Sequence, residues 1–134
     1  MKVKVNLFLC IFLLVFVVSC NKDDDDEYLG DWWEMSGFDG IPRSLAVGFS
    51  IGDRGYIGTG FDGDDRLKDF WEYNPDRDEW TQKADLPGVE RTDAVGFGID
   101  GKGYIGTGYD GENELNDFYE YDPQTNEWKQ KADY

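Results

Sequence analysis

An internal repeat constrains the fold of this chain more than any other feature of the sequence. Residues 43–85 align without a gap on residues 91–133, which lie 48 positions later, and 26 of the 43 aligned pairs are identical. A period of roughly 20–50 residues is typical of architectures in which one unit cannot bury its apolar face and needs a stacked neighbour. We therefore expect one structural unit used twice, at residues 43–90 and 91–134.

Each unit alternates short runs of β-forming residues with turn residues, which predicts four strands per unit. The predicted strands are 45–51, 55–60, 69–73 and 79–83 in the first unit, and 93–99, 103–108, 117–121 and 127–131 in the second. Along the first strand bulky residues alternate with small ones, so one face should be bulky and the other nearly flat. A flat face lets a neighbouring sheet come close. In the first unit the two faces are Val47, Phe49, Ile51 and Ala46, Gly48, Ser50.

Several short motifs recur at equivalent places in the two units. They are GYIGTG at 55–60 and 103–108, FWEYNP at 70–75, FYEYDP at 118–123, and the tryptophans Trp80 and Trp128. An arginine, Arg43 or Arg91, leads the first strand of each unit. Together these marks resemble the kelch repeat. The resemblance implies an all-β fold in which each unit is a four-stranded antiparallel blade of a propeller.

The resemblance also implies that this chain holds a partial propeller. Kelch-like propellers mostly have six or seven blades, and two blades do not close a ring. Trp32 precedes Arg43 by the same 11 positions that separate Trp80 from Arg91, so residues 31–42 read as an orphan outer strand of a preceding blade. A truncated propeller, a ring of several copies and a two-blade unit that works alone all explain this. We favour truncation, and self-association through unclosed blade edges is the second expectation.

Residues 1–19 are predicted to be a removable signal peptide. Lys2 and Lys4 precede an apolar run at 7–18 that is shorter than the roughly 20 residues a membrane-spanning helix needs. The run ends in Val-Val-Ser-Cys at 17–20, which resembles the lipobox of bacterial lipoproteins and favours lipidation of Cys20 over a plain secretory signal. Because Cys10 leaves with the signal, no internal disulfide is expected.

Residues 20–30 are expected to be the lipidated cysteine and an acidic tether. The segment NKDDDDE at 21–27 has no apolar residue and should stay extended. An acidic stretch after the lipidated cysteine also resembles the export tag of some Gram-negative lipoproteins. We therefore expect a chain that is anchored to the cell envelope, at the outer membrane and facing outward, although a plain solvated spacer explains the same residues.

Composition excludes several classes of function. The net charge is −16, and it falls to −18 when Lys2 and Lys4 are removed with the signal peptide. Such a charge repels phosphate, so nucleic-acid binding is not expected. The chain has no histidine, which excludes histidine-based nucleophilic triads and most catalytic zinc or copper sites. We expect no catalytic residue, metal ligand or cofactor in this sequence, and hence no enzyme.

The acidic loops and the repeated acids have structural explanations. The loop that starts at Asp62 lacks the glycine and glutamate of an EF-hand, so a solvated turn is favoured over a weak calcium site. Asp69 and Glu72 could act as an acid–base pair. Their recurrence at Asp117 and Glu120 favours a structural role, because a catalytic site is normally built once.

Two sets of residues are candidates to face a ligand. Arg43 and Arg91 lie where the first strands begin, near one end of the propeller; a salt bridge between blades is the favoured role and ligand contact the alternative. The second set is where the two copies differ, and it comprises Asp64, Asp65, Arg66, Glu112, Asn113 and Glu114.

The sequence therefore predicts a lipid-anchored kelch-type module that acts as a non-catalytic binding platform for a protein or a glycan. The alternative is a fragment of a kelch-type carbohydrate-active enzyme, similar to a sialic-acid epimerase, whose catalytic residues lie in blades outside this sequence. The identity of the ligand is not encoded in any motif described above.

Overall fold

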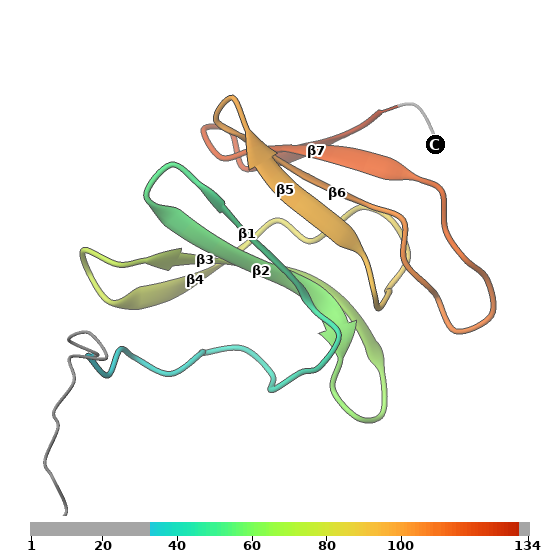
Figure 1. Ribbon diagram of the computed structural model, residues 1–134, viewed down its shortest axis with the longest axis horizontal. Coiled ribbons are helices and arrows are strands. Elements are labelled where there is room, and N and C mark those ends of the chain that lie inside the picture. Colours follow the sequence, from blue (N-terminus) through green and yellow to red (C-terminus); the bar gives the residue numbers. More distant parts are fainter. Residues whose placement is uncertain (1–32, 132–134) are drawn as a thin grey trace, which may run out of the picture. The chain divides into compact units, whose positions relative to one another are not determined.

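The computed structural model describes residues 33–131 and consists of two antiparallel β-sheets in one compact unit that begins at Met35. Each sheet has four strands in sequence order. Figure 1 shows the two sheets. The first sheet is β1 (Val47–Ile51), β2 (Arg54–Phe61), β3 (Arg66–Asn74) and β4 (Glu79–Lys83). The second sheet is β5 (Val95–Ile99), β6 (Lys102–Gly106), β7 (Phe118–Asp122) and β8 (Glu127–Gln130). The predicted all-β fold of two four-stranded blades is confirmed, and we call the sheets blade 1 and blade 2.

The predicted strands are all present, but the inner strands start later than expected. β1 begins at Val47 and β5 at Val95, two residues after the predicted starts. Leu45 and Asp93, which lie at those predicted starts, have φ values of 56° and 58°. Left-handed backbone cannot continue a β-strand, so the chain turns before it enters the sheet.

The second strands differ between the blades at their far ends. Thr59 and Thr107 both have positive φ, which interrupts the ladder. In blade 1 the pairing resumes after this irregularity at Gly60 and Phe61, where the Arg66 guanidinium lies 5.9 Å from the Phe61 ring centroid. In blade 2 strand β6 ends at Gly106 and not at the predicted residue 108. The blades are therefore not identical at the loop that joins the second and third strands.

Blade 1 packs its bulky face onto the flat face of blade 2. Val47 and Ile51 are buried there, and a Cβ atom at Gly96 would lie 2.6 Å from Val47 Cγ2. A Cβ atom at Gly98 would overlap the Ser50 carbonyl oxygen. Glycine is thus required at position 98 because two backbones approach each other, and at position 96 it makes room for the Val47 side chain, as the alternation along the first strand predicted.

Aromatic rings extend this interface outward across both blades. Phe70 of β3 is fully buried, and its ring centroid lies 4.9 Å from that of Tyr121 and 5.0 Å from that of Trp128. Trp128 Nε1 also donates a hydrogen bond to the Ala84 carbonyl oxygen, at 2.8 Å, in the segment that joins the blades. Trp128 therefore fixes its blade to the neighbour, in addition to packing on its own sheet at Tyr121.

The segment before blade 1 packs on that blade as the joining segment packs on blade 2. The Ser36 amide donates to Asp78 Oδ1 at 2.8 Å, and the Ala84 amide donates to Asn126 Oδ1 at 2.9 Å, 48 positions later. The Phe38 ring lies 4.9 Å from the Trp80 ring.

None of the described residues in 33–42 forms a strand, whereas the sequence predicted an orphan strand in 31–42. An outer strand needs a third strand beside it, and among the described residues each third strand already has its own fourth. Trp32, the signal peptide, Cys20 and the acidic tether lie outside the described residues. Within 33–131 no helix is long and apolar enough to cross a membrane.

Candidate functional site

Arg91 forms a buried clamp inside blade 2. Its side chain is 0% exposed, and its Nη1 and Nη2 atoms donate to the two carboxylate oxygens of Asp117 at 2.5 and 2.8 Å. The same guanidinium donates to the carbonyl oxygens of Thr107 and Val89. This hydrogen bonding to Arg91 holds the pKa of Asp117 below its usual range. Of the five N–H groups of the Arg91 guanidinium, all but one at Nη2 donate to oxygen atoms of the protein.

Arg43 repeats this clamp in blade 1, where it pairs with both carboxylate oxygens of Asp69. Burial alone would raise the pKa of Asp69, but the Arg43 guanidinium and the Trp71 ring N–H, which donates at 2.7 Å, hold it below its usual range. The predicted salt bridge between blades is wrong, because each arginine pairs with an aspartate of its own blade. The Arg43 side chain is 2% exposed, so neither arginine faces solvent as a ligand-binding residue would.

The backbone of Arg91 does join the blades. Its amide donates to the Leu67 carbonyl oxygen at 3.1 Å, and its carbonyl oxygen accepts from the Gly60 amide at 2.8 Å. The side chain of Arg91 thus stabilises blade 2 while its main chain holds blade 1. The registration of the two blades depends on this residue.

The other acid pair that recurs is also structural. Glu72 accepts from the Tyr56 hydroxyl at 2.6 Å, and Glu120 accepts from the Tyr104 hydroxyl at 2.9 Å. Burial, followed by the bond to Glu72, raises the pKa of Tyr56. Asp69 bonds Arg43 and Trp71 instead, so Asp69 and Glu72 belong to separate networks and do not form an acid–base pair.

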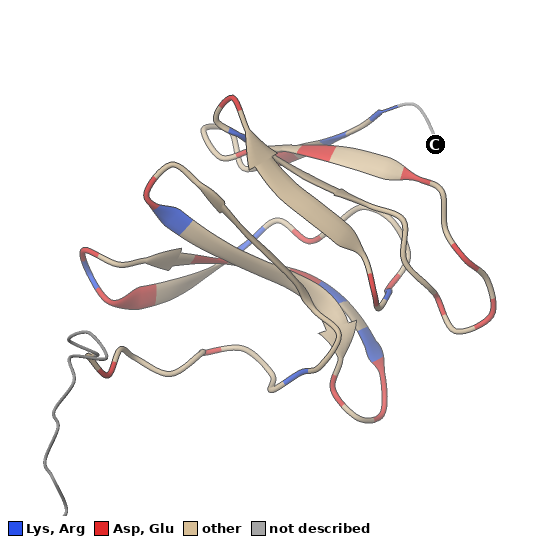
Figure 2. Cartoon of the chain, viewed as in Figure 1, with Lys and Arg blue, Asp and Glu red and all other residues tan. Residues whose placement is uncertain are grey.

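The acidic loops are turns closed by their first aspartate. Asp62 Oδ1 accepts the amides of Asp64 and Asp65 at 2.9 and 2.7 Å, and Asp110 repeats this with its own loop. These backbone N–H groups hold the pKa of Asp62 below its usual range. The acids of both loops gather at loop ends in Figure 2. In the part of the chain that the structure describes, no group of three or more acidic or sulfur side chains is arranged to hold a metal.

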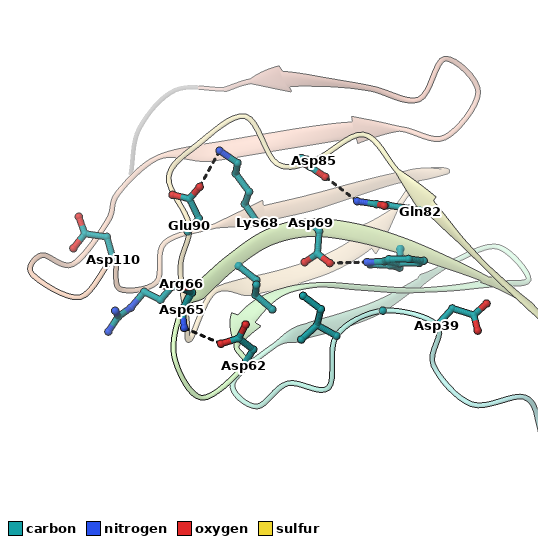
Figure 3. A pocket seen from close by; sticks show the side chains of 14 residues that line it. Asp39, Asp62, Asp65, Arg66, Lys68, Asp69, Gln82, Asp85, Glu90 and Asp110 are labelled. Atoms are coloured by element: carbon teal, nitrogen blue, oxygen red, sulfur yellow. Dashed lines mark hydrogen bonds and ion pairs between the residues drawn. The ribbon is translucent and has the colours of Figure 1, made fainter.

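An open cleft of about 1000 Å³ lies along β3 of blade 1, and Figure 3 shows it from close by. Its walls come from the segment before blade 1, the loop after β2, strand β3, the end of β4, and the segment that joins the blades, with one residue from blade 2. The lining residues are Asp39, Gly40, Ile41, Asp62, Asp65, Arg66, Leu67, Lys68, Asp69, Trp71, Gln82, Asp85, Glu90 and Asp110.

Many of the cleft residues are the ones that differ between the two copies. Asp65, Arg66, Lys68 and Trp71 correspond to Asn113, Glu114, Asn116 and Tyr119 in blade 2. The structure thus brings Asp65 and Arg66 of the predicted set into the cleft. Asp64 and the second-copy candidates Glu112, Asn113 and Glu114 are exposed on their loops and do not line it.

Sequence reasoning missed several polar and aromatic cleft residues. For Asp39, Lys68 and Trp71 the signal that could have found them was their replacement by a different residue type 48 positions later. Gln82 and Asp85 recur as Gln130 and Asp133 and carry no such signal, and Glu90 lies outside the aligned repeat. The motif FWEYNP was interpreted as blade building only. Its tryptophan also lines the cleft.

The cleft is acidic because its carboxylates outnumber its two bases, Arg66 and Lys68. Lys68 Nζ lies 3.0 Å from Glu90 Oε1, and both side chains are partly exposed. The Arg66 guanidinium lies 5.3 Å from the Tyr109 ring centroid. Asp39, Asp65 and Asp85 remain as carboxylates without an ion pair among the described residues. The cleft should therefore attract cationic or neutral polar groups and repel anions.

The comparisons with known proteins agree on the repeat and the fold. The family model described as the Kelch motif matches residues 60–87 and 108–133, one match in each blade. The solved structure of YjhT matches 78% of this chain with a TM-score of 0.69 and 18% sequence identity. This chain spans 42% of the length of YjhT. No curated protein matches the chain. With a Kelch motif matched in each of its two four-stranded blades, the chain has the repeat and the fold of a partial kelch-type β-propeller.

Proposed function

We propose that this protein is a non-catalytic binding module of the cell envelope and that its ligand binds in the cleft along β3. One observation carries the proposal: four residues that differ between the two copies, Asp65, Arg66, Lys68 and Trp71, line a single cleft. Side chains that are needed for blade building recur in both blades. Side chains that serve a ligand need to occur only once, so they are free to differ.

The chemistry of the cleft favours a neutral glycan or a basic segment of a protein. Trp71 supplies an aromatic surface beside Ile41, and Gln82 and Asp85 supply polar groups at the rim. An aromatic surface with a few polar groups is the usual composition of small-molecule and sugar sites. The excess of carboxylates disfavours an anionic substrate such as a sialic acid, which the enzyme alternative would need.

Repeat-swap variants test the proposal without endangering the fold. Asp65→Asn, Lys68→Asn and Trp71→Tyr give blade 1 the residues that blade 2 already uses at the same places. The matched control is the reverse exchange in blade 2, Asn113→Asp with Asn116→Lys, which lies outside the cleft. The full chain is first screened on an array of neutral and sialylated glycans and against basic and acidic peptides.

We expect binding to neutral glycans or basic peptides, and at least about a tenfold loss of affinity in the combined cleft swap, since each lost polar contact or aromatic surface is worth roughly 1 kcal/mol. The control should bind as the wild type does. Unchanged affinity in the cleft swap would show that the ligand binds elsewhere. Selective binding of sialylated glycans would favour the carbohydrate-active alternative, with catalytic residues contributed by blades outside this sequence.

We also propose that a lipid on Cys20 holds the module in the outer membrane and that the acidic tether places it outside the cell. The support is the sequence of residues 1–30. Metabolic labelling with an alkyne fatty acid should mark the wild type and not Cys20→Ser. Cleavage by protease added to intact cells tests the outward orientation. An in-frame continuation of the 48-residue period in the DNA beyond the last codon would support a truncated propeller.

A further inference from the structure

The interface between the two blades shows what a neighbouring blade must present. Blade 1 offers a bulky face, and blade 2 accepts it with glycines. A Cβ atom at Gly103 would lie 2.7 Å from Phe49 Cε2, and one at Gly98 would overlap the carbonyl oxygen of Ser50. Because the second contact is with backbone, it cannot be relieved by rotating a side chain. The accepting blade must therefore have glycine at the position of Gly98.

The same interface has an electrostatic contact at the loop end. The Arg66 guanidinium of blade 1 lies over the Tyr109 ring of blade 2, at 5.3 Å, and a Cβ atom at Gly111 would lie 2.5 Å from its Nη1. A cation over the face of an aromatic ring is favourable. Asp110, beside these residues, has its pKa lowered mainly by the amides of Asn113 and Glu112, and also by the charge of Arg66. Blade 1 thus presents a base to an acidic, aromatic loop.

Blade 2 presents a second bulky face that is not covered in the described structure. Its residues Val95, Phe97 and Ile99 are 57%, 43% and 53% exposed, whereas Val47 and Ile51 in blade 1 are buried. The Phe97 ring stacks on Tyr104 at 5.2 Å, as Phe49 stacks on its own tyrosine in blade 1. Strand β5 carries no charged residue and is uncoloured along its length in Figure 2. We call Val95, Phe97 and Ile99 the β5 face.

A second copy of this chain does not match the β5 face at two positions. The residue of blade 1 that corresponds to Gly98 is Ser50, whose Cβ would overlap the Gly98 carbonyl oxygen of the blade that carries the β5 face. The residue of blade 2 that corresponds to Arg66 is Glu114, so a carboxylate would meet the Phe61 ring and Asp62 of a second copy. Like charges at an interface are unfavourable. One mismatch is steric and the other electrostatic, and they act at opposite ends of the interface.

We propose that the β5 face docks a β-sheet blade that has glycine where blade 1 has Ser50 and a basic residue opposite Glu114, and that Ser50 and Glu114 prevent a second copy of this chain from docking there. The β5 face supplies the apolar contact area, as its counterpart does in blade 1. Glu114 supplies charge selectivity. This proposal concerns a different surface from the cleft along β3 and does not depend on it.

The test gives blade 1 the features that we expect of the partner, so that blade 1 of one copy can dock on the β5 face of another. The variant S50G/D64K removes the steric mismatch and places a lysine next to Gly63, the counterpart of Gly111, so that blade 1 of one copy meets Glu114 of another with a base. The charge-matched control is S50G/D53K, whose lysine lies in the exposed turn at the opposite end of β2. Ile99→Glu and, separately, Val95→Glu introduce a charge on the β5 face. Circular dichroism and tryptophan fluorescence verify the fold of each full-length chain in detergent.

Sedimentation velocity over a range of concentrations gives the association constants. We expect the wild type to remain monomeric and S50G/D64K to associate at least about tenfold more tightly than S50G/D53K, since an unfavourable contact becomes a favourable one. Adding either β5-face charge should abolish this association. Equal association of the two lysine variants would overturn the charge selectivity. Association of the wild type that is lost with Ile99→Glu or Val95→Glu would overturn the proposal by showing that a second copy is the partner.

Discussion

Replacing Arg91 with alanine should lower the free energy of unfolding, by an amount that the contacts of its side chain allow us to estimate. The substitution leaves the Asp117 carboxylate without its partner, and it leaves the carbonyl oxygens of Thr107 and Val89 without this donor. Removing one partner of a buried ion pair destabilises by about 3–5 kcal/mol. Because the Asp117 side chain is 20% exposed, water replaces part of the lost interaction. We therefore expect a loss of about 2–4 kcal/mol in the free energy of unfolding.

This loss should be visible in a thermal melt followed by circular dichroism. For a domain of this size each 1 kcal/mol lowers the Tm by about 4–8 °C, so the Tm should fall by about 10–25 °C. Arg77→Ala is the matched control, since Arg77 lies in the exposed turn after β3. A change in Tm no larger than that of the control would refute the reasoning. A double-mutant cycle with Asp117→Ala should show a coupling of about 1–3 kcal/mol.

Three further predictions test the interface, the ion pairs and the tyrosines. Gly98→Ala should lower the free energy of unfolding by about 1–3 kcal/mol in a urea titration, because its Cβ meets the Ser50 carbonyl oxygen; Gly37→Ala, where nothing lies within 4 Å, should have no such effect. Acid titration should destabilise the fold, since Asp117 has a pKa below its unfolded value near 3.9; its contribution is complete above about pH 4 and is lost as the pH falls through the lowered pKa, so a fold equally stable at pH 2 and pH 6 would contradict this. Alkaline titration should destabilise it too, because burial raises the pKa of Tyr121 to about 12; its stabilising contribution is present below about pH 10 and is lost between pH 10 and 12, as absorbance and circular dichroism recorded together should show.

Local patterns predicted the strands because they depend on alternation and turn residues, which the sequence displays directly. β4 was predicted at its observed bounds, Glu79–Lys83. The starts of β1 and β5 were wrong because Leu45 and Asp93 adopt positive φ. Leucine rarely adopts positive φ, so the residue type at position 45 gives no sign of this conformation. The inner strands therefore lost their first two predicted residues to a feature of the tertiary fold.

The structural role of the two arginines could be predicted from the sequence, but their ion-pair partners could not. The recurrence of Arg43 and Arg91 pointed to a structural role, and burial agrees with that role. The partner could not be predicted, because many carboxylates recur at the same period. Only the folded path of the chain within the blade decides which one lies within reach. The structure selects the aspartate 26 residues later, at the start of the third strand of the same blade.

The cleft could be predicted in part from differences between the copies. Asp65 and Arg66 were identified in this way, and Trp71 was not, because a tryptophan aligned with Tyr119 resembles a conservative change within a blade. Its role depends on the segment at 39–41, which closes the cleft beside it and has no strand pattern. Contacts between a strand and an irregular segment leave no periodic signal in a sequence.

The differences between the copies separate into two kinds, and the separation supports the proposal for the β5 face. Ser36 with Asp78 becomes Ala84 with Asn126, so donor and acceptor change together and the hydrogen bond to the backbone is kept. Such a paired change is explained inside the protein. Glu114 is different. It stands where blade 1 has Arg66, and it forms no ion pair among the described residues. Glu114 also lies where its counterpart Arg66 contacts the neighbouring blade, so its uncompensated charge favours a partner that supplies a base there.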